Sequence, residues 1–268
     1  MKHLLRNVHF FLGLFGLDLL KTIHTTCRLP GFFHNLRTFR KQNKAAGHDF
    51  PVTKLYPCLE DRFYESGSGR GAYFHQDLLV ARRIFERKPS VHFDVGSRID
   101  GFVAHVATFR EINVVDIRPM TSDILNVSFV QADMMKPVPS SLGACCDSIS
   151  CLHALEHFGL GRYGDPLRFD GHLLGLENLH RMLKPGGLLY LAVPIGPQRI
   201  EFDAHRVFSV RYLLSLLAEK YNVMCFSFVD DRGNLHENVP LQAADVENSY
   251  GCRYGCGIFE LVKRERIS

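Results

Sequence analysis

The sequence has eight cysteines but no Cys-x-x-Cys pair and no Cys/His spacing of the kind that binds zinc. This lack argues against a structural zinc site. Cys252 and Cys256 stand four residues apart in a glycine-rich segment, so a disulfide between them stays open. Reduced thiols are the simpler interpretation, and they lead us to expect a cytoplasmic protein.

Long runs of lysine or arginine are also missing, and the net charge of the 268-residue chain is only +4. A charge that small does not indicate a nucleic-acid partner, and we expect none. No internal repeat or low-complexity tract is visible. With 46% apolar and 22% charged residues, the chain can bury a sizeable core, as one large domain or as a domain with an appendage.

The first 33 residues lack an uninterrupted apolar run. Lys2 and Arg6 precede an apolar stretch, as in a signal peptide, but Asp18 breaks the stretch and no small-x-small cleavage site follows. The stretch is also too short for a transmembrane span. We expect an amphipathic helix that packs on the domain, on a partner protein or on a membrane surface, which would be the inner face of the membrane.

Residues 34–70 are polar and mixed, and the stretch ESGSGRG at 65–71 has the composition of a linker. The basic residues of this region fit a solvated face: Arg37, Arg40, Lys41 and Lys44. We therefore predict an N-terminal helical and apolar segment with its linker over residues 1–70, and a second domain over residues 71–268.

Apolar strands and amphipathic helices alternate regularly in the second domain. This alternation predicts an α/β fold with a doubly wound, mostly parallel Rossmann-like sheet and helices on both faces. Helices are expected at 73–87, 101–109, 172–184 and 209–220. Strands are expected at 91–95, 112–117, 126–133, 145–152 and 188–194, followed by two closing strands at 221–230 and 257–264.

The first of these strands runs into a loop that lacks the second glycine of a dinucleotide site. G-x-G-x-x-G lets the backbone approach a pyrophosphate, but here Arg98 takes the place of that glycine. Asp100 would add a carboxylate beside the phosphates, so phosphate binding is disfavoured. S-adenosylmethionine carries a sulfonium and an amino-acid zwitterion instead of phosphate, and Arg98 would face its carboxylate.

Five fragments stand in the order typical of one enzyme class. They are Asp94-Val-Gly96, Asp116 at a strand end, Ala132-Asp133-Met134, residues 147–157, and the turn Leu183-Lys-Pro-Gly-Gly187. With the closing strands they resemble class I S-adenosylmethionine-dependent methyltransferases over about residues 71–264. More narrowly, ALEHFGLGRYGDP, KPGGLLYLAVPIG and DAHRVFS resemble DUF268, a group without an established substrate.

The resemblance implies S-adenosylmethionine as the cofactor. Asp116 matches the acid that holds both ribose hydroxyls, because one carboxylate can pair with two hydroxyls at once. Asp133 and Met134 match the segment that meets the adenine. The full set of expected cofactor residues is Asp94, Gly96, Ser97, Arg98, Asp116, Ile117, Asp133, Met134 and His153.

Two histidines are candidates for the proton transfer that methylation of a hydroxyl requires. A neutral imidazole suits a general base near neutral pH, and His157 and His205 follow the fourth and fifth strands. Glu156 is the reserve candidate, because burial can raise a carboxylate's pKa into the working range. Glu156, His157, Asp203 and His205 also leave a divalent metal site open, although no tight ligand spacing favours one.

The segment 160–172 is an unusually polar insertion, and loops at this edge of a sheet carry specificity. Either its polar residues bind a polyhydroxylated or anionic acceptor, or they only form a solvated loop. These residues are Arg162, Tyr163, Asp165, Arg168 and Asp170. We expect O-methylation of a sugar or surface polysaccharide, with another small molecule or a lipid-linked glycan as alternative acceptor. A catalytically degenerate binding or scaffold module is the rival class, and a nicotinamide oxidoreductase is disfavoured by Asp100.

Overall fold

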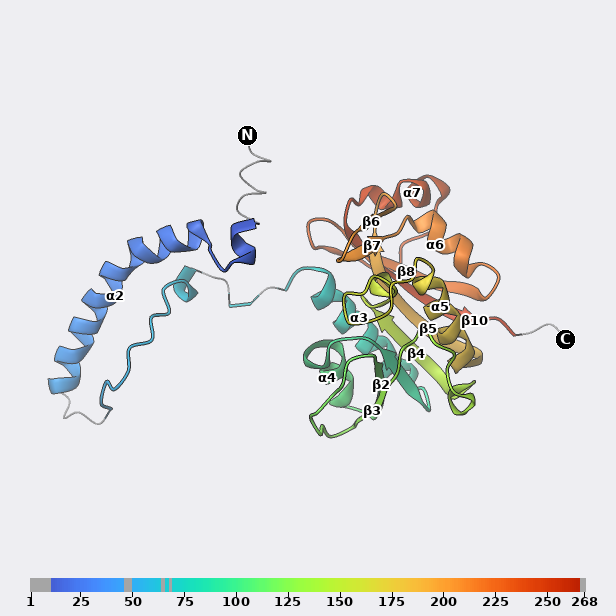
Figure 1. Cartoon of the computed structure of the whole chain (residues 1–268), viewed down its shortest axis with the longest axis horizontal. Helices are drawn as coiled ribbons and strands as arrows, with labels where there is room; N and C mark the ends of the chain where they lie inside the picture. The colour runs from blue at the N-terminus through green and yellow to red at the C-terminus, as the bar shows by residue number, and fades with distance from the viewer. Residues whose placement is uncertain (1–10, 46–49, 64–65, 68, 266–268) are drawn as a thin grey trace. The chain divides into compact units, whose positions relative to one another are not determined.

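The computed structural model describes residues 11–45, 50–63, 66–67 and 69–265. The chain divides into two compact units, Met1–Gly67 and Ser68–Ser268 (Figure 1). The boundary between the units falls within the linker-like stretch 65–71.

The first unit is built on one long helix, α2 (Leu19–Ala45). Asp18 accepts a hydrogen bond from the Lys21 amide at 2.9 Å and so caps its start. The helix passes through Pro30 and continues to residue 45, beyond the expected end at residue 33. Its apolar side chains are spread around the helix axis, so it is not the amphipathic helix that the sequence predicted. Lys2 and Arg6, which prompted the signal-peptide comparison, lie outside the described residues. None of the described helices combines the length and apolarity needed to cross a bilayer.

A short 3₁₀ turn, η1 (Asp61–Phe63), lies beside Arg28 in the first half of α2. The guanidinium of Arg28 stands 3.7 Å from the Glu60 carboxylate and 4.2 Å from the centre of the Phe63 ring. These contacts fold the 50–63 segment back along the helix.

The second unit is an α/β domain, as expected. Its helices are α3 (Ala72–Arg87), α4 (Ala104–Ala107), α5 (Gly171–Met182), α6 (Val210–Leu217) and α7 (Ala243–Glu247). Its main sheet contains β1 (His92–Val95), β2 (Ile112–Asp116), β3 (Val127–Gln131), β4 (Cys146–Leu152), β5 (Leu183–Ile195), β8 (Tyr221–Val229), β9 (Leu235–His236) and β10 (Gly255–Lys263).

The sheet order is β3-β2-β1-β4-β5-β10-β8-β9. Strands β1 to β5 pair in parallel, whereas β10 lies antiparallel between β5 and β8. The order reverses between β1 and β4, which places the carboxyl ends of these strands around a crevice. The predicted doubly wound sheet with a closing antiparallel pair is confirmed.

Two apolar clusters cover the two faces of the sheet, because the central strands are buried on both sides. Helices α5 and α6 pack into one cluster, and α3 and α4 into the other. Glu260 of β10 is buried and accepts from Arg83 at 3.0 Å and from Arg87 at 2.6 Å. This double ion pair fixes the end of α3 to the sheet and thereby sets where its first turn lies.

The structure corrects the sequence interpretation in three places. The expected turn Leu183–Gly187 belongs to β5, because Leu183 already pairs with Cys146 of β4 before a shift in register. The expected helix over 101–109 is a π-helical turn, η2 (Ile99–Val103), followed by the single turn of α4, because Gly101 has non-helical backbone angles. The segment after β5, expected as a loop, forms a small hairpin of β6 (Arg199–Glu201) and β7 (His205–Val207).

Candidate functional site

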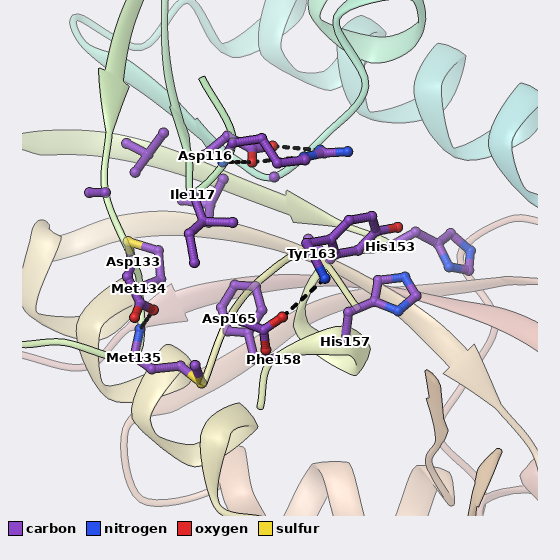
Figure 2. A pocket seen from close by; sticks show the side chains of 16 residues that line it. Asp116, Ile117, Asp133, Met134, Met135, His153, His157, Phe158, Tyr163 and Asp165 are labelled. Carbon is purple, nitrogen blue, oxygen red and sulfur yellow. Dashed lines mark hydrogen bonds and ion pairs between the residues drawn. The ribbon is translucent and has the colours of Figure 1, made fainter. Parts of the chain in front are cut away.

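A pocket lies where β1, β2 and β4 end (Figure 2). Its walls come from the loops after these strands, from residues 132–135 after β3, and from the loop that carries Tyr163. The pocket therefore occupies the crevice at which a doubly wound sheet binds its ligand.

The loop after β1 is held by buried polar contacts. Asp94 accepts from the Ser97 amide at 3.1 Å, from the Ser97 hydroxyl at 2.7 Å and from the Ser150 hydroxyl at 2.6 Å. Burial raises the pKa of Asp94 to about 6, against the lowering effect of these hydrogen bonds. Since Asp94 is fully buried, its carboxylate holds the loop from the interior of the protein and does not line the pocket.

Gly96 begins the turn with a φ of +76°, a conformation that favours glycine. A Cβ at this position would come within 2.7 Å of the Ala154 side chain in the loop after β4. The close approach of the two loops, together with the positive φ, explains why glycine stands here.

Arg98, which replaces the second glycine, points into solvent. Its guanidinium pairs with Asp100 at 2.7 Å, and the two side chains are 70% and 71% exposed. The two charged side chains that made this loop unusual in the sequence therefore form an ion pair with each other. The expectation that Arg98 faces a cofactor carboxylate requires this exposed pair to separate.

Asp116 lies at the pocket wall where β2 ends, and Arg118 already occupies its carboxylate. Arg118 donates through Nε at 3.0 Å and through Nη2 at 2.6 Å, and its amide adds a third bond at 2.8 Å. The same guanidinium stands 4.6 Å from the centre of the Tyr163 ring, so Arg118 joins Asp116 to the far wall.

The remaining wall is largely apolar. Ile117, Met134 and Phe158 line it, with Ala154 at the base. The side chain of Asp133 turns back to accept from the Met135 amide at 2.9 Å (Figure 2). This surface suits a flat heterocycle with few polar edges.

His157 lines the pocket in a defined tautomer. Its Nδ1 donates to the carbonyl oxygen of Ala204 at 2.6 Å, because a carbonyl can only accept. Burial lowers the pKa of His157, although Glu156 and the Ala204 bond raise it. Nε2 stands 3.7 Å from a Glu156 oxygen, beyond hydrogen-bond distance, and keeps its lone pair.

His153 and Glu156 form a buried pair beside this imidazole. Nδ1 of His153 donates to Glu156 at 2.8 Å, whereas Nε2 of His153 and Oε2 of Glu156 are buried without hydrogen-bond partners. Burial opposes protonation of His153, but the neighbouring Cys256 and Glu156 raise its pKa well above the ordinary value. The backbone of His153 is left-handed, with a φ of +51°.

His205 belongs to β7 and is not part of the pocket wall. Its Nε2 is buried, makes no hydrogen bond, and lies 3.4 Å from the Glu201 carboxylate. Burial lowers its pKa, and Glu201 and Glu156 oppose the shift. Its ring centre is 6.3 Å from that of His157. Within the described ranges, no group of three or more His, Cys, Asp and Glu side chains is placed to hold a metal ion.

Three features of the site escaped the sequence analysis. Asp165 accepts from the amides of Gly159, Gly161 and Tyr163 at 2.7, 3.3 and 3.2 Å, which fixes the loop that presents Tyr163. The glycines around Asp165 were the signal that could have revealed this turn.

The second feature is Arg206, a buried cation that pairs with no carboxylate in the described part of the chain. Its guanidinium donates to the backbone oxygens of Glu156, Phe158, Arg168 and Phe169. It therefore holds the loop after β4 in place. The third is the first turn of α3, where Tyr73, Gln76 and Asp77 line a polar extension beside the glycine loop.

Solved structures with a similar fold include methyltransferases. Over 88% of this chain and 90% of the other, the structure matches 1,6-didemethyltoxoflavin-N1-methyltransferase from Burkholderia thailandensis, crystallised with its substrate and S-adenosylhomocysteine, at 15% identity and a TM-score of 0.50. N-methyltransferase NodS from Bradyrhizobium japonicum matches over 74% of this chain and 100% of its own, at 13% identity and a TM-score of 0.50.

A third match is the methyltransferase partner in the complex with the Haloferax volcanii Trm112 activator. It covers 74% of this chain and 92% of the other, at 16% identity and a TM-score of 0.50. A search of curated proteins finds no match. The expected class I methyltransferase fold is thus confirmed.

The family comparison is more specific than the fold. Residues 105–248 match the model described as "Caenorhabditis protein of unknown function, DUF268". The matched region begins in α4 and runs through the loop after β4, the β6–β7 hairpin and α7. It covers more than half of the sequence, and the chain belongs to the DUF268 family.

Proposed function

We propose that the second unit is an S-adenosylmethionine-dependent methyltransferase that methylates a hydroxyl of a sugar or surface polysaccharide. The observation that carries the proposal is that one pocket holds both Asp116 at the end of β2 and the imidazole of His157. The first suits a ribose and the second suits removal of an acceptor proton. The matched Burkholderia enzyme, crystallised with S-adenosylhomocysteine, supports the choice of cofactor.

The pocket chemistry fits this cofactor better than a phosphate-bearing one. Its apolar wall suits an adenine, and Asp116 offers a carboxylate where ribose hydroxyls are held. Asp133 and Asp165 would repel a pyrophosphate. We assign the adenine side to Ile117, Asp133 and Met134, the ribose to Asp116, and the amino-acid end to Gly96, Ser97, Arg98 and His153, with Asp94 as the support of the loop.

The chain's own residues carry the proton step. The cofactor supplies a methyl group already activated by its sulfonium. His157 takes the acceptor hydroxyl proton on Nε2, since Ala204 keeps Nδ1 protonated. The Glu156 carboxylate, 3.7 Å away, stabilises the positive charge that the ring then carries. Glu156 is thus a positioning residue here. The ring of His205 lies 6.3 Å from that of His157 and outside the pocket wall.

The loop of Tyr163 supplies the acceptor side. Arg162 is exposed, donates to the Ala204 oxygen at 3.1 Å and pairs with no carboxylate among the described residues. A guanidinium with no described carboxylate partner, 5.3 Å from the centre of the Tyr163 ring, suits an acceptor rich in hydroxyls or carrying an acidic group. We place the reaction in the cytoplasm, which the eight unpaired cysteines support.

Calorimetric titration with S-adenosylmethionine and with S-adenosylhomocysteine is the first test. Binding of both, followed by transfer of labelled methyl groups to purified polysaccharides as alkali-stable ethers, supports the proposal. Binding without transfer to any glycan, but with transfer to an amine, would keep the enzyme class and discard the acceptor.

A second candidate function is a degenerate fold that acts as a binding or scaffold module. The bidentate hold of Arg118 on Asp116 favours it, since the ribose must share or displace that contact. Titration of Arg118→Ala separates the candidates. If neither the wild type nor this variant binds the cofactor, the scaffold function replaces the enzyme.

A further inference from the structure

The second half of α2 carries four cations on one face. Arg37, Arg40, Lys41 and Lys44 follow the spacing i, i+3, i+4 and i+7, which brings them together on a helix. All four are exposed, and with Phe33 and Leu36 they line a shallow groove. We call these four residues the basic face.

Among the described residues, no acidic side chain pairs with the basic face. Helix α2 contains no Asp or Glu from Leu19 to Ala45. Within residues 11–45 and 50–63 none of the four cations forms an ion pair, whereas Arg28 of the same helix contacts Glu60. Like charges at these spacings destabilise an isolated helix, so an anionic surface that met all four would stabilise it.

One large apolar side chain stands exposed on the same face as these cations. Phe33 is 55% exposed and lies one turn before Arg37, so it shares their side of the helix and lines the same groove. Lys and Arg can lay their apolar stems along a hydrocarbon boundary while their charged ends reach phosphates. The four cations and Phe33 together therefore suit an interface that is anionic outside and apolar beneath.

We propose that the basic face docks the first unit onto an anionic phospholipid surface, with its four cations on lipid phosphates and carboxylates. A nucleic acid would neutralise the same charges but would leave the Phe33 ring in water. The docking site extends the expected contact of residues 1–33 to residue 44. It depends on neither the cofactor nor the acceptor of the second unit.

Flotation of the full chain with vesicles tests the docking. Phosphatidylcholine vesicles are compared with phosphatidylcholine–phosphatidylserine vesicles at physiological and high salt. We expect binding only to the anionic vesicles, weakened by salt, because surface charges are screened. The combined change Arg37→Gln, Arg40→Gln, Lys41→Gln and Lys44→Gln should reduce the partition coefficient roughly tenfold or more.

A matched control removes four positive charges elsewhere. Lys54→Gln, Lys136→Gln, Lys184→Gln and Arg232→Gln change exposed residues outside the basic face and should leave flotation unchanged. A charge-retaining variant, Arg37→Lys with Arg40→Lys, should also bind normally, which separates loss of charge from loss of the helix.

Three results would overturn the proposal. Equal binding to neutral and anionic vesicles would remove the role of charge. Equal loss in the two quadruple variants would show that overall charge acts, not the basic face. Retention of duplex DNA, with no flotation of the same preparation, would assign the surface to nucleic acid.

Discussion

Nδ1 of His157 lies 2.6 Å from the carbonyl oxygen of Ala204, a residue that the β6–β7 hairpin places beside it. The contact leaves Nε2 as the accepting nitrogen in the pocket. Two histidines that were equal candidates in the sequence thus differ in the structure, since His205 lies outside the pocket wall and its Nε2 is buried.

We therefore expect His157→Ala to lower kcat by about 10²–10⁴-fold while the affinity for S-adenosylmethionine stays within a few fold, because a general base contributes to the chemical step. His205→Ala should lower kcat far less. Steady-state rates give kcat and calorimetry gives the cofactor affinity, so the two measurements on both variants separate the effects. A larger loss in His205→Ala would reverse the assignment of the base.

The pH dependence of the wild type offers an independent measurement. Burial lowers the pKa of His157 below its ordinary value of 6.5. Because the base must be neutral to accept a proton, kcat/KM should rise with pH through an apparent pKa below 6.5 and then level off. A rise centred well above 6.5 would indicate another base.

The positions of the strands along the chain were readable from the sequence because each central strand is a short apolar run closed by a turn signal. The β6–β7 hairpin was not readable, since its three-residue strands alternate too briefly to show a period. That hairpin supplies the carbonyl of Ala204, so the contact that distinguishes the histidines was hidden with it.

Side-chain pairing was the other limit of the sequence analysis. Asp116 was placed at a strand end correctly, but Arg118 two residues later gave no sign that it would close on the carboxylate. Tyr163 lies 45 positions beyond Arg118 in the chain, and only the fold brings the two together. Contacts of this kind depend on loop geometry that no periodic pattern specifies.

Arg206 offers a test of how the loop after β4 is held. Arg206→Met removes donors from four backbone oxygens, of which the Phe158 oxygen lies at 2.6 Å. Leaving buried acceptors without partners should lower the free energy of unfolding by about 1–3 kcal/mol. Arg199→Met, an arginine on the other strand of the hairpin that pairs with Glu201, should change it by less. Urea denaturation compares the two, and equal effects would contradict the special role of Arg206.

Asp94 predicts a particular dependence of stability on pH. Its pKa is raised to about 6 by burial, above the ordinary 3.8. An acid with a raised folded-state pKa stabilises the fold fully below 3.8, and this contribution is lost as pH rises through 6. We expect a loss of up to about 3 kcal/mol across that window, at about 1.4 kcal/mol per pKa unit.

Asp94→Asn isolates this contribution, because the amide does not titrate. The difference in free energy of unfolding between wild type and variant, followed by urea denaturation from pH 3 to pH 7, should shift against the wild type as pH rises. A difference that stays constant over the range would show that Asp94 titrates normally.

Asp116 and Arg118 give opposite predictions for cofactor affinity. Asp116→Ala should weaken S-adenosylmethionine binding by about 1.5–3 kcal/mol, the range for losing hydrogen bonds to a charged group. Arg118→Ala frees the same carboxylate, which Arg118 now holds through two guanidinium nitrogens. Its affinity should therefore be equal to or higher than that of the wild type, unless the contact with Tyr163 closes the pocket over the ligand.

The variant Tyr163→Leu removes that contact alone and decides between these outcomes. If the tyrosine ring holds Arg118 over a bound cofactor, Tyr163→Leu and Arg118→Ala should both weaken binding by about 0.5–1 kcal/mol, and the double variant by no more than either. If Arg118 competes for Asp116, only Arg118→Ala should change the affinity, and upward. Calorimetric titration of the three variants and the wild type measures both the effect of the tyrosine ring and the effect of competition by Arg118. Unchanged affinity in a folded Asp116→Ala variant would remove Asp116 from the cofactor site altogether.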